Sequence, residues 1–241
     1  MTALDPRPRR RPAALRAVLF DMDGLLVDSE PLWFEVERAV MARLGGQWGE
    51  ADQEALIGGS LDRTVSWLLA KAAVRASRDD VARWLVAEMA ALIGARGLPL
   101  QPGAGPLLAG LDAAGVRCAL VTASSRAIME AVLKVTALSF SVTVCGEDVR
   151  RGKPDPEPYM LAADRLGVPA AGCVVLEDSP TGIAAARAAG CPVIAVPSVP
   201  VPPGPGVVAV GSLEEVGFDL LESVVTGNFE DPGRAVTEKS R

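Results

Sequence analysis

The sequence contains no histidine among its 241 residues. This absence excludes Ser-His-Asp and Cys-His triads, His-ligated zinc sites and every histidine general base. Any catalysis must therefore use carboxylates, hydroxyls, thiols, lysine or a metal ion that prefers oxygen ligands.

Cysteine is also scarce, with four residues and no CxxC pair. Three of them (Cys118, Cys145 and Cys173) lie in or beside apolar runs, which indicates buried, inert thiols; these and Cys191 suit a reducing cytoplasm. The N-terminal segment lacks the apolar stretch of a signal peptide, and no run reaches the roughly 18 apolar residues of a membrane span. We therefore expect a soluble, cytoplasmic protein that does not act at a membrane.

Clustered positive charge is confined to the extreme N-terminus, and the net charge is -6. Nucleic acid is therefore not an expected partner, because binding to its backbone needs clustered Lys and Arg. With 49% hydrophobic and 22% charged residues, the chain has the composition of an ordinary globular protein that builds its own core. We expect a monomer.

Short apolar runs alternate with segments of helical periodicity along most of the chain. The expected strands, buried on both faces, are 16–20, 116–121, 141–145, 173–177 and 192–196, and the expected helices between them are 125–136, 156–167 and 180–189. This alternation predicts an α/β fold with a Rossmann-like parallel sheet and helices on both faces. Reactive groups in such sheets gather beyond the carboxyl ends of the strands.

The interval from Pro31 to about Leu98 breaks this alternation, because it contains helical patterns and no convincing strand. A helical insert after the first strand explains it, with hinges near Asp28 and Gly97. We predict a core of residues 15–30 and 98–227 and an all-helical cap of residues 31–97. Residues 1–14 and 228–241 are expected to be disordered, and the proline-rich segment 197–206 is expected to be a loop.

The strongest local pattern is AVLFDMDGLLVDSE, in which an apolar strand ends directly on Asp21 and Asp23 follows two residues later. Two carboxylates this close repel each other, and a hard cation such as Mg²⁺ relieves that conflict. An acidic turn that caps the next helix is the alternative. It explains Asp28 and Ser29 better than Asp21, because a cap does not require an apolar strand running straight into it.

Hydroxyl side chains follow the second predicted strand, in the segment ALVTASS. Thr122 and Ser124, together with backbone N–H groups at the start of the next helix, are suited to holding phosphate oxygens. Ser and Thr also cap helices commonly, so this segment alone leaves both interpretations open.

A lysine stands on a short, rigid loop in the segment RRGKPDPEPY. Lys153, between a glycine and a proline, would neutralise phosphoryl charge and a carboxylate if it faces the acidic residues. An isolated surface lysine is the alternative. Asp155 and Pro156 are expected to serve only as the cap and first turn of the following helix.

A second acidic pair ends a buried strand in the segment CVVLEDSPTG. Glu177 and Asp178 would supply the remaining oxygen ligands of a metal ion, whereas Ser179 suits the cap of the next helix. Because the segments follow one another at predicted parallel strands, they favour one common site.

These four segments resemble the four motifs of the haloacid dehalogenase-like hydrolase superfamily: DMDG, the strand that ends in Thr122, GKPDP around Lys153, and LEDS. The resemblance covers residues 16–225. The helical insert is similar to the small cap of the branch that includes β-phosphoglucomutase and sugar-phosphate phosphatases. The stretch DMDGLLVDSEPLW is especially similar to bacterial hexose- and hexitol-phosphate phosphatases of that branch.

The resemblance implies a Mg²⁺-dependent phosphatase for a small phosphorylated metabolite, a sugar or polyol phosphate of the hexose 6-phosphate type. Asp21 would be the nucleophile that forms an aspartyl-phosphate, and Asp23 the general acid and base. Thr122 would bind the phosphoryl group, and Lys153 would offset its charge. The implied Mg²⁺ ligands are Asp21, Asp23 (through its backbone carbonyl), Asp178 and, directly or through water, Glu177.

The expected contact with the leaving group is Trp33, because its helix leaves the catalytic loop directly. Arg63, and Ser124 in the core, complete the expected substrate-binding set. Further candidates are Glu30 and Lys71. Two or three of the four tryptophans (Trp33, Trp48, Trp67 and Trp84) are expected to pack the cap helices.

A phosphomutase remains an alternative activity. β-Phosphoglucomutase-like enzymes carry a histidine near the position of Trp33 and an arginine near the position of Leu61, and this chain has neither; Arg63 would be a partial substitute. A haloalkanoate dehalogenase is disfavoured by Asp23. A non-catalytic binding protein is disfavoured because it would not need the nucleophile Asp21.

Overall fold

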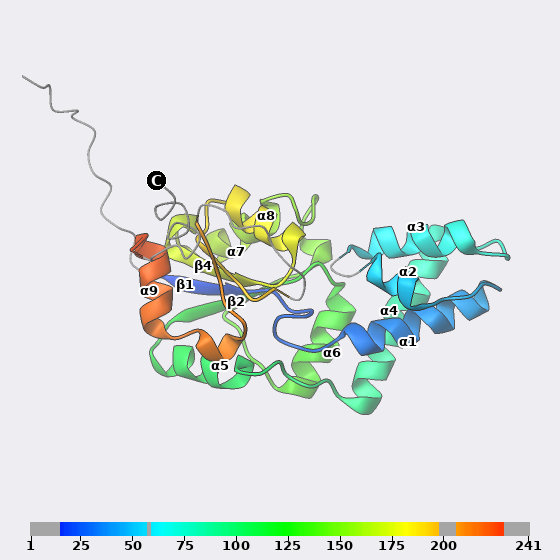
Figure 1. The fold of residues 1–241 in the computed structure, drawn as a ribbon, viewed down its shortest axis with the longest axis horizontal. Helices are drawn as coiled ribbons and strands as arrows, with labels where there is room; N and C mark the ends of the chain where they lie inside the picture. The colour runs from blue at the N-terminus through cyan, green and yellow to red at the C-terminus, as the bar shows by residue number, and fades with distance from the viewer. Residues whose placement is uncertain (1–14, 57–58, 198–205, 229–241) are drawn as a thin grey trace, which may run out of the picture.

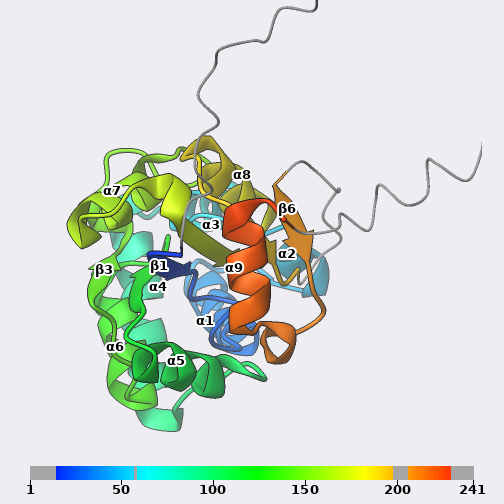
Figure 2. The same ribbon diagram turned by 90° about the vertical axis from the view of Figure 1, so that its left-hand side faces the viewer.

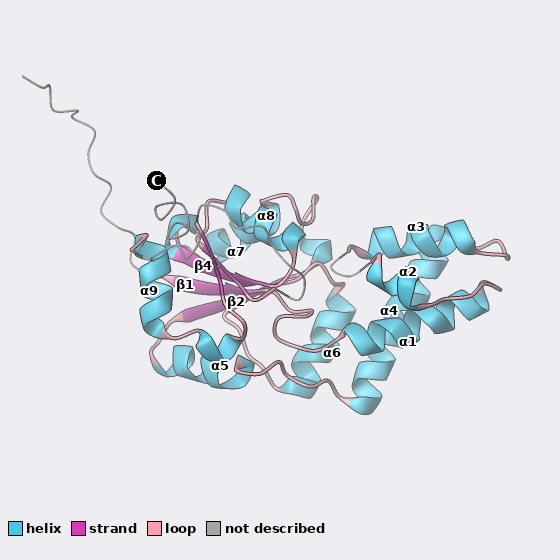
Figure 3. Cartoon of the chain, viewed as in Figure 1, coloured by secondary structure: helices cyan, strands magenta, loops and turns pink. Residues whose placement is uncertain are grey.

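The computed structural model describes residues 15–56, 59–197 and 206–228. Its centre is a parallel sheet with the strand order β3-β2-β1-β4-β5-β6 (Figures 1 and 3). The strands are β1 (Ala17–Phe20), β2 (Arg117–Val121), β3 (Val142–Val144), β4 (Cys173–Glu177), β5 (Val193–Ala195) and β6 (Val207–Ala209). The predicted α/β class with a Rossmann-like sheet is confirmed.

Helices cover both faces of the sheet, which is why its central strands are apolar along most of their length (Figure 2). One face packs against α5 (Ala104–Ala113), α6 (Arg126–Thr136) and α9 (Phe218–Thr226), and the other against α7 (Glu157–Leu166) and α8 (Pro180–Ala188). In β1, Val18 and Phe20 face the first group, whereas Ala17 and Leu19 face the second. Helices therefore cover β1 on both faces of the sheet up to its last residue, Phe20.

Four further helices form a group beside the carboxyl end of the sheet (Figure 1). They are α1 (Glu30–Arg43), α2 (Glu50–Glu54), α3 (Leu61–Lys71) and α4 (Arg78–Arg96). The described part of residues 31–97 contains no strand, as the sequence predicts, and α4 packs against α6 of the core. We propose that these cap helices form a cap domain.

The chain passes between core and cap through two segments that lie side by side. The backbone N–H of Asp28 donates to the carbonyl of Pro99 at 3.1 Å, and that of Gln101 donates to Leu26 at 2.8 Å. Residues 26–28 and 99–101 are called the paired connection below. Gly97, with φ +74°, follows the end of α4 just before it. A hinge at this place stays a prediction.

The N-termini of α8, α7 and α1 carry the three residues for which the sequence suggested helix caps. Ser179 caps α8 through Oγ, which accepts from the Gly182 N–H at 3.0 Å, as expected. Asp155 Oδ1 accepts from the Glu157 N–H at 3.0 Å, but Pro156 holds the N-cap position of α7, and Asp155 also forms an ion pair with Arg151. Ser29 stands at the N-cap position of α1, but its side chain makes no capping bond among the described residues. The capping interpretation of Ser29 is therefore wrong, and its hydroxyl points elsewhere.

The C-terminal part of the sheet was not predicted. Strand β6 has only three residues and follows a proline-rich segment, so it offered no visible pattern, and α9 was not singled out. The predicted loop 197–206 and the predicted disordered ends lie almost wholly outside the described residues.

All four cysteines are free and buried, which confirms the burial predicted for Cys118, Cys145 and Cys173 and adds Cys191. Burial raises the pKa of Cys118 and of Cys191 to about 12, so both stay protonated and unreactive. Among the described helices, none has both the length and the hydrophobicity that a membrane crossing needs.

Candidate active site

The carboxyl ends of the central strands meet at one cleft of about 310 Å³ between the sheet and the cap helices. Asp21 and Asp23 follow β1, Thr122 follows β2, and Asp178 follows β4. Lys153 reaches the same cleft from the loop before α7. Parallel strands bring these distant residues together because their carboxyl ends share one edge of the sheet.

Lys153 and Asp21 form a buried ion pair. The Lys153 Nζ lies 2.5 Å from Asp21 Oδ1, 2.6 Å from Glu177 Oε1 and 2.9 Å from the Val121 carbonyl. Burial alone would lower the pKa of Lys153, but the charges of Asp21 and Glu177 outweigh it and hold that pKa above its ordinary value. The lysine is therefore a fixed cation at the end of β1, and the surface-lysine alternative is wrong.

Negative charge is crowded around Asp21. Burial raises its pKa well above the usual range; Lys153 opposes this, while Glu177, Asp178 and Asp23 add to it. Oxygen atoms of Asp21, Glu177 and Asp178 lie within 4.8 Å of one another. An all-oxygen set of buried carboxylates with excess negative charge fits a hard divalent cation such as Mg²⁺.

The hydrogen bonds of Glu177 distinguish it from the other two acids. Its Oε1 accepts from Lys153 and, at 2.6 Å, from the Tyr159 hydroxyl. Its Oε2 accepts from the backbone N–H and the hydroxyl of Ser179 at 3.1 and 3.0 Å. Glu177 is fully buried and does not line the cleft, so proximity alone puts it in the acidic cluster. Its filled hydrogen bonds favour orienting Lys153 over direct metal ligation.

Asp23 is held by three hydroxyl groups from two segments, the residue before α1 and the stretch after β2. Ser29 and Ser124 each donate to it at 2.8 Å, to Oδ1 and Oδ2 respectively, and Thr122 Oγ1 lies 3.3 Å from Oδ2. The Thr122 Oγ1 also accepts from the backbone N–H of Ser124 at 2.9 Å. The hydroxyls predicted to bind phosphate thus converge on this carboxylate.

Gly24 allows the loop after β1 to lie close to Asp178, the residue that follows β4. Its φ is +84°, and a Cβ atom at this position would lie 2.3 Å from Asp178 Oδ2. Both the backbone conformation and the close approach of Asp178 therefore require glycine.

The cap helices contribute Trp33, Arg63 and Glu30 to the lining of the cleft, as the sequence suggested. The Arg63 Nη2 donates to the Ala55 carbonyl at 2.7 Å. Lys71 does not line the cleft; it forms an ion pair with Asp52 on the cap. Its candidacy for substrate binding is therefore wrong, because a nearby acid within the cap already holds it.

The remaining tryptophans do not line the cleft. Trp48 is buried, Trp67 donates through Nε1 to Asp52 at 2.9 Å, and the Arg43 guanidinium lies 3.7 Å from the centre of the Trp84 ring.

Sequence reasoning missed several residues of the site, among them Ser29, Glu37 and Gln53. Glu37 and Gln53 line the cleft, and Ser29 contacts Asp23. A signal for Glu37 existed, because Glu30, Trp33 and Glu37 are spaced to share one face of a helix. Ser29 was misread because its local pattern also suits a helix cap.

Known proteins resemble this chain over most of its length. The family profile of the haloacid dehalogenase-like hydrolases matches residues 15–190. Hexitol phosphatase A of Escherichia coli (strain K12) is 37% identical over 182 residues, which cover 75% of this chain and 82% of that protein. Hexitol phosphatase B of the same strain is 35% identical over 191 residues, which cover 78% and 86%.

A solved structure is similar in fold as well. CbbY from Rhodobacter sphaeroides in complex with phosphate aligns with a TM-score of 0.78 and 28% identity, over 84% of this chain and 96% of that one. The profile match runs from β1 to the end of α8 and so includes every strand end that contributes to the cleft. The chain belongs to the haloacid dehalogenase-like hydrolase family.

Proposed function

We propose that this protein is a Mg²⁺-dependent phosphatase that hydrolyses a small phosphate monoester through an aspartyl-phosphate on Asp21. The observation that carries the proposal is the pair of Lys153 Nζ and Asp21 Oδ1, 2.5 Å apart in the lining of the cleft, with Asp23 two residues after Asp21. A nucleophile, a fixed cation and a second carboxylate are the groups that phosphoryl transfer needs.

In the first step, a carboxylate oxygen of Asp21 attacks phosphorus, and the bond from phosphorus to the leaving oxygen breaks. Asp23 in its protonated form gives its proton to that oxygen, so an alcohol departs. Lys153 lies where the negative charge of the phosphoryl oxygens develops, and it is already in place before reaction. Ser29 and Ser124 fix the orientation of the Asp23 carboxyl group.

In the second step, Asp23 takes a proton from a water molecule, whose oxygen attacks phosphorus. The bond between phosphorus and Asp21 breaks, inorganic phosphate leaves, and both aspartates return to their starting states. Thr122, which follows the neighbouring strand, is suited to donating its hydroxyl to a phosphoryl oxygen in place of its long contact with Asp23, whereas the Ser124 hydroxyl stays with Asp23.

Asp21 and Asp178, with the backbone carbonyl of Asp23, would hold Mg²⁺, and Glu177 would support the site from behind. The bound ion would neutralise phosphoryl charge. The buried, charge-crowded carboxylates described above support this assignment.

The substrate class is a sugar or polyol phosphate. The cleft continues into the cap helices, where Trp33, Glu30 and Arg63 present one apolar and two polar surfaces to a leaving group. The related hexitol phosphatases support this class. They also favour a phosphatase over a phosphomutase. A monomeric state and a cytoplasmic location stay predictions.

The test is release of inorganic phosphate from sugar, polyol and nucleotide monophosphates, with Mg²⁺ and with a chelator. We expect release that depends on Mg²⁺ and is fastest with a sugar or polyol phosphate. Absence of release from every compound would contradict the proposal. Formation of an isomer that depends on a sugar bisphosphate would favour the phosphomutase.

A further inference from the structure

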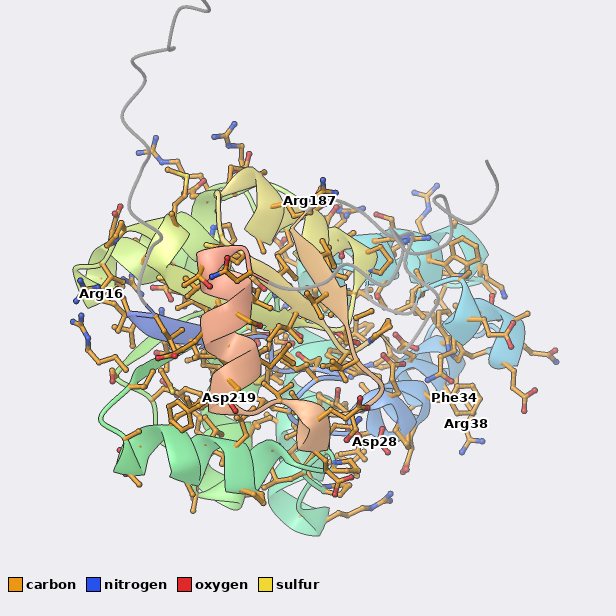
Figure 4. All side chains as sticks on the ribbon, turned by 60° about the vertical axis from the view of Figure 1, so that its left-hand side comes forward. Arg16, Asp28, Phe34, Arg38, Arg187 and Asp219 are labelled. Atoms are coloured by element: carbon orange, nitrogen blue, oxygen red, sulfur yellow. The ribbon has the colours of Figure 1, made fainter. Side chains whose placement is uncertain are left out.

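A buried acid stands on the cap side of the cleft. Glu37 lies on α1 at positions i+4 from Trp33 and i+7 from Glu30, and all three line the cleft. On another side of the same helix Arg38 is exposed, and its guanidinium carbon lies 5.9 Å from the centre of the half-buried Phe34 ring (Figure 4). The helix thus separates an outward face from a face turned to the substrate.

The carboxyl group of Glu37 is incompletely satisfied by the protein. Glu37 is only 4% exposed, and its Oε2 has no hydrogen-bond partner among the described residues. The indole Nε1 of the neighbouring Trp48 is also buried without a partner there, so the two groups are close but do not form a well-aligned hydrogen bond with each other. Burial raises its pKa to about 7; the charge of Glu30 adds to this, and the nearby Trp48 indole opposes it. Buried polar groups are nearly always hydrogen-bonded, and one left unpaired is destabilising. A ligand that supplies the missing bond would therefore bind favourably.

The charges around Glu37 restrict what that ligand is. Glu30 is held nearby by Gln53, whose Nε2 donates to its backbone carbonyl at 2.9 Å and to its Oε2 at 3.4 Å. Among the described cap residues that line the cleft, Arg63 is the one cation, and its Nη2 is already bonded to the Ala55 carbonyl. Glu30 and Glu37 therefore outnumber the one guanidinium group, that of Arg63. A second anionic group on the ligand would be repelled here.

We infer that Glu37 is a specificity-determining residue that hydrogen-bonds a hydroxyl group of the leaving group, so that the cleft selects an uncharged, polyhydroxylated alcohol over one with a second phosphate. This inference rests on the proposed phosphatase function. A hydroxyl donates to an ionised carboxylate and accepts from a neutral acid, so it suits Glu37 in either state. A phosphate dianion offers no donor and meets like charge from Glu30.

The experiment compares three substrates: a hexitol 6-phosphate, a hexose 1,6-bisphosphate, and p-nitrophenyl phosphate, whose leaving group has no further hydroxyl. For Glu37→Leu, we expect the ratio of kcat/KM for hexitol phosphate over p-nitrophenyl phosphate to fall about 10–100-fold, as for the loss of one hydrogen bond to an acid. For Glu37→Gln, which keeps the shape, we expect the bisphosphate to gain about fivefold relative to the hexitol phosphate, because one negative charge is removed. A ratio of kcat/KM between two substrates of the same variant reports recognition of the leaving group, because a general loss of activity lowers both values equally.

Glu88→Gln is the matched control, because Glu88 is an exposed acid of α4 that does not line the cleft. It should leave both ratios unchanged. Equal losses on all substrates, or ratios that do not respond to either Glu37 variant, would overturn the inference and leave the phosphatase function intact. So would a wild-type enzyme that hydrolyses p-nitrophenyl phosphate but no hydroxylated ester. Failure of the wild type on every substrate with Mg²⁺ would overturn the proposed function and this inference with it.

Discussion

The hydroxyl of Ser29 donates a hydrogen bond of 2.8 Å to Asp23 Oδ1, so the first residue before the cap helix α1 touches the proposed acid and base. Ser29 is fully buried. The start of the cap and the orientation of Asp23 are thereby joined through one side chain.

Removal of this bond should slow catalysis more than it weakens binding. For Ser29→Ala we expect kcat to fall about tenfold, the effect of about 1.4 kcal/mol in the transition state, with little change in KM. Helix stability should change little, because this hydroxyl caps nothing. Steady-state kinetics measure the effect, and Ser223→Ala on α9 is the control. A changed KM with unchanged kcat would show that Ser29 does not orient Asp23.

Asp21→Asn should abolish turnover, because an amide does not attack phosphorus. We expect kcat to fall by about 10⁴-fold or more, as when a nucleophile is removed from other enzymes. The fold should persist, since Asn has the same shape and Lys153 keeps its bond to Glu177. Phosphate release and circular dichroism test both points. Steady-state turnover close to that of the wild type would exclude Asp21 as nucleophile.

Lys153→Ala should lower both activity and stability. It leaves Asp21 and the fully buried Glu177 without their shared cation. Loss of one partner from a buried ion pair destabilises by about 3–5 kcal/mol. Urea denaturation near neutral pH measures this, and Lys134→Ala, an exposed lysine of α6, is the control. Stability equal to the wild type would show that these acids do not depend on Lys153.

Glu37 should make stability fall as the pH rises. Its pKa is about 7 in the folded protein against 4.5 in a free side chain, so between these values the folded state binds more protons than the unfolded state. The loss of folding free energy caused by ionising the buried Glu37 is absent below pH 4.5 and complete above pH 7. Glu37→Gln should therefore be more stable than the wild type by about 3 kcal/mol at pH 8, and by much less at pH 5. Urea denaturation at both pH values tests this; a difference that does not depend on pH would contradict it.

Chelation of divalent cations should abolish activity, and added Mg²⁺ should restore it. Binding to the folded state alone should also stabilise it, by about 2.7 kcal/mol at a hundred times Kd. Asp178→Asn should remove most of this stabilisation. Thermal denaturation with and without Mg²⁺ detects it independently of turnover. Equal stabilisation of wild type and variant would place the ion elsewhere.

The sequence was sufficient to predict the part of the site that depends on strand ends. Asp21, Thr122 and Asp178 follow apolar runs directly, and a parallel sheet brings such positions to one edge whatever their distance in the chain. Lys153 was recognised through its rigid loop and its motif, and the structure adds that Glu177 and Tyr159 surround it.

The cap was less predictable, because helix periodicity shows which residues share a face but not what that face meets. Glu37 reads as an ordinary helical acid, and only tertiary packing buries it. Lys71 was an equally plausible substrate contact until Asp52 was found beside it. The role of the Ser29 hydroxyl was missed for a similar reason. Its partner, Asp23, lies in the loop before α1 and not in the helix itself.

The paired connection makes the cap replaceable. Because the chain leaves the core at Leu26 to Asp28 and returns at Pro99 to Gln101, both ends of the insert are fixed at one place by backbone bonds. Backbone bonds of this kind do not depend on side-chain identity, so a helical insert of another length or sequence can be grafted between the same two ends without altering the order of the strands. If the insert keeps Ser29, we expect the phosphoryl-transfer groups to stay constant while the leaving-group specificity is exchanged.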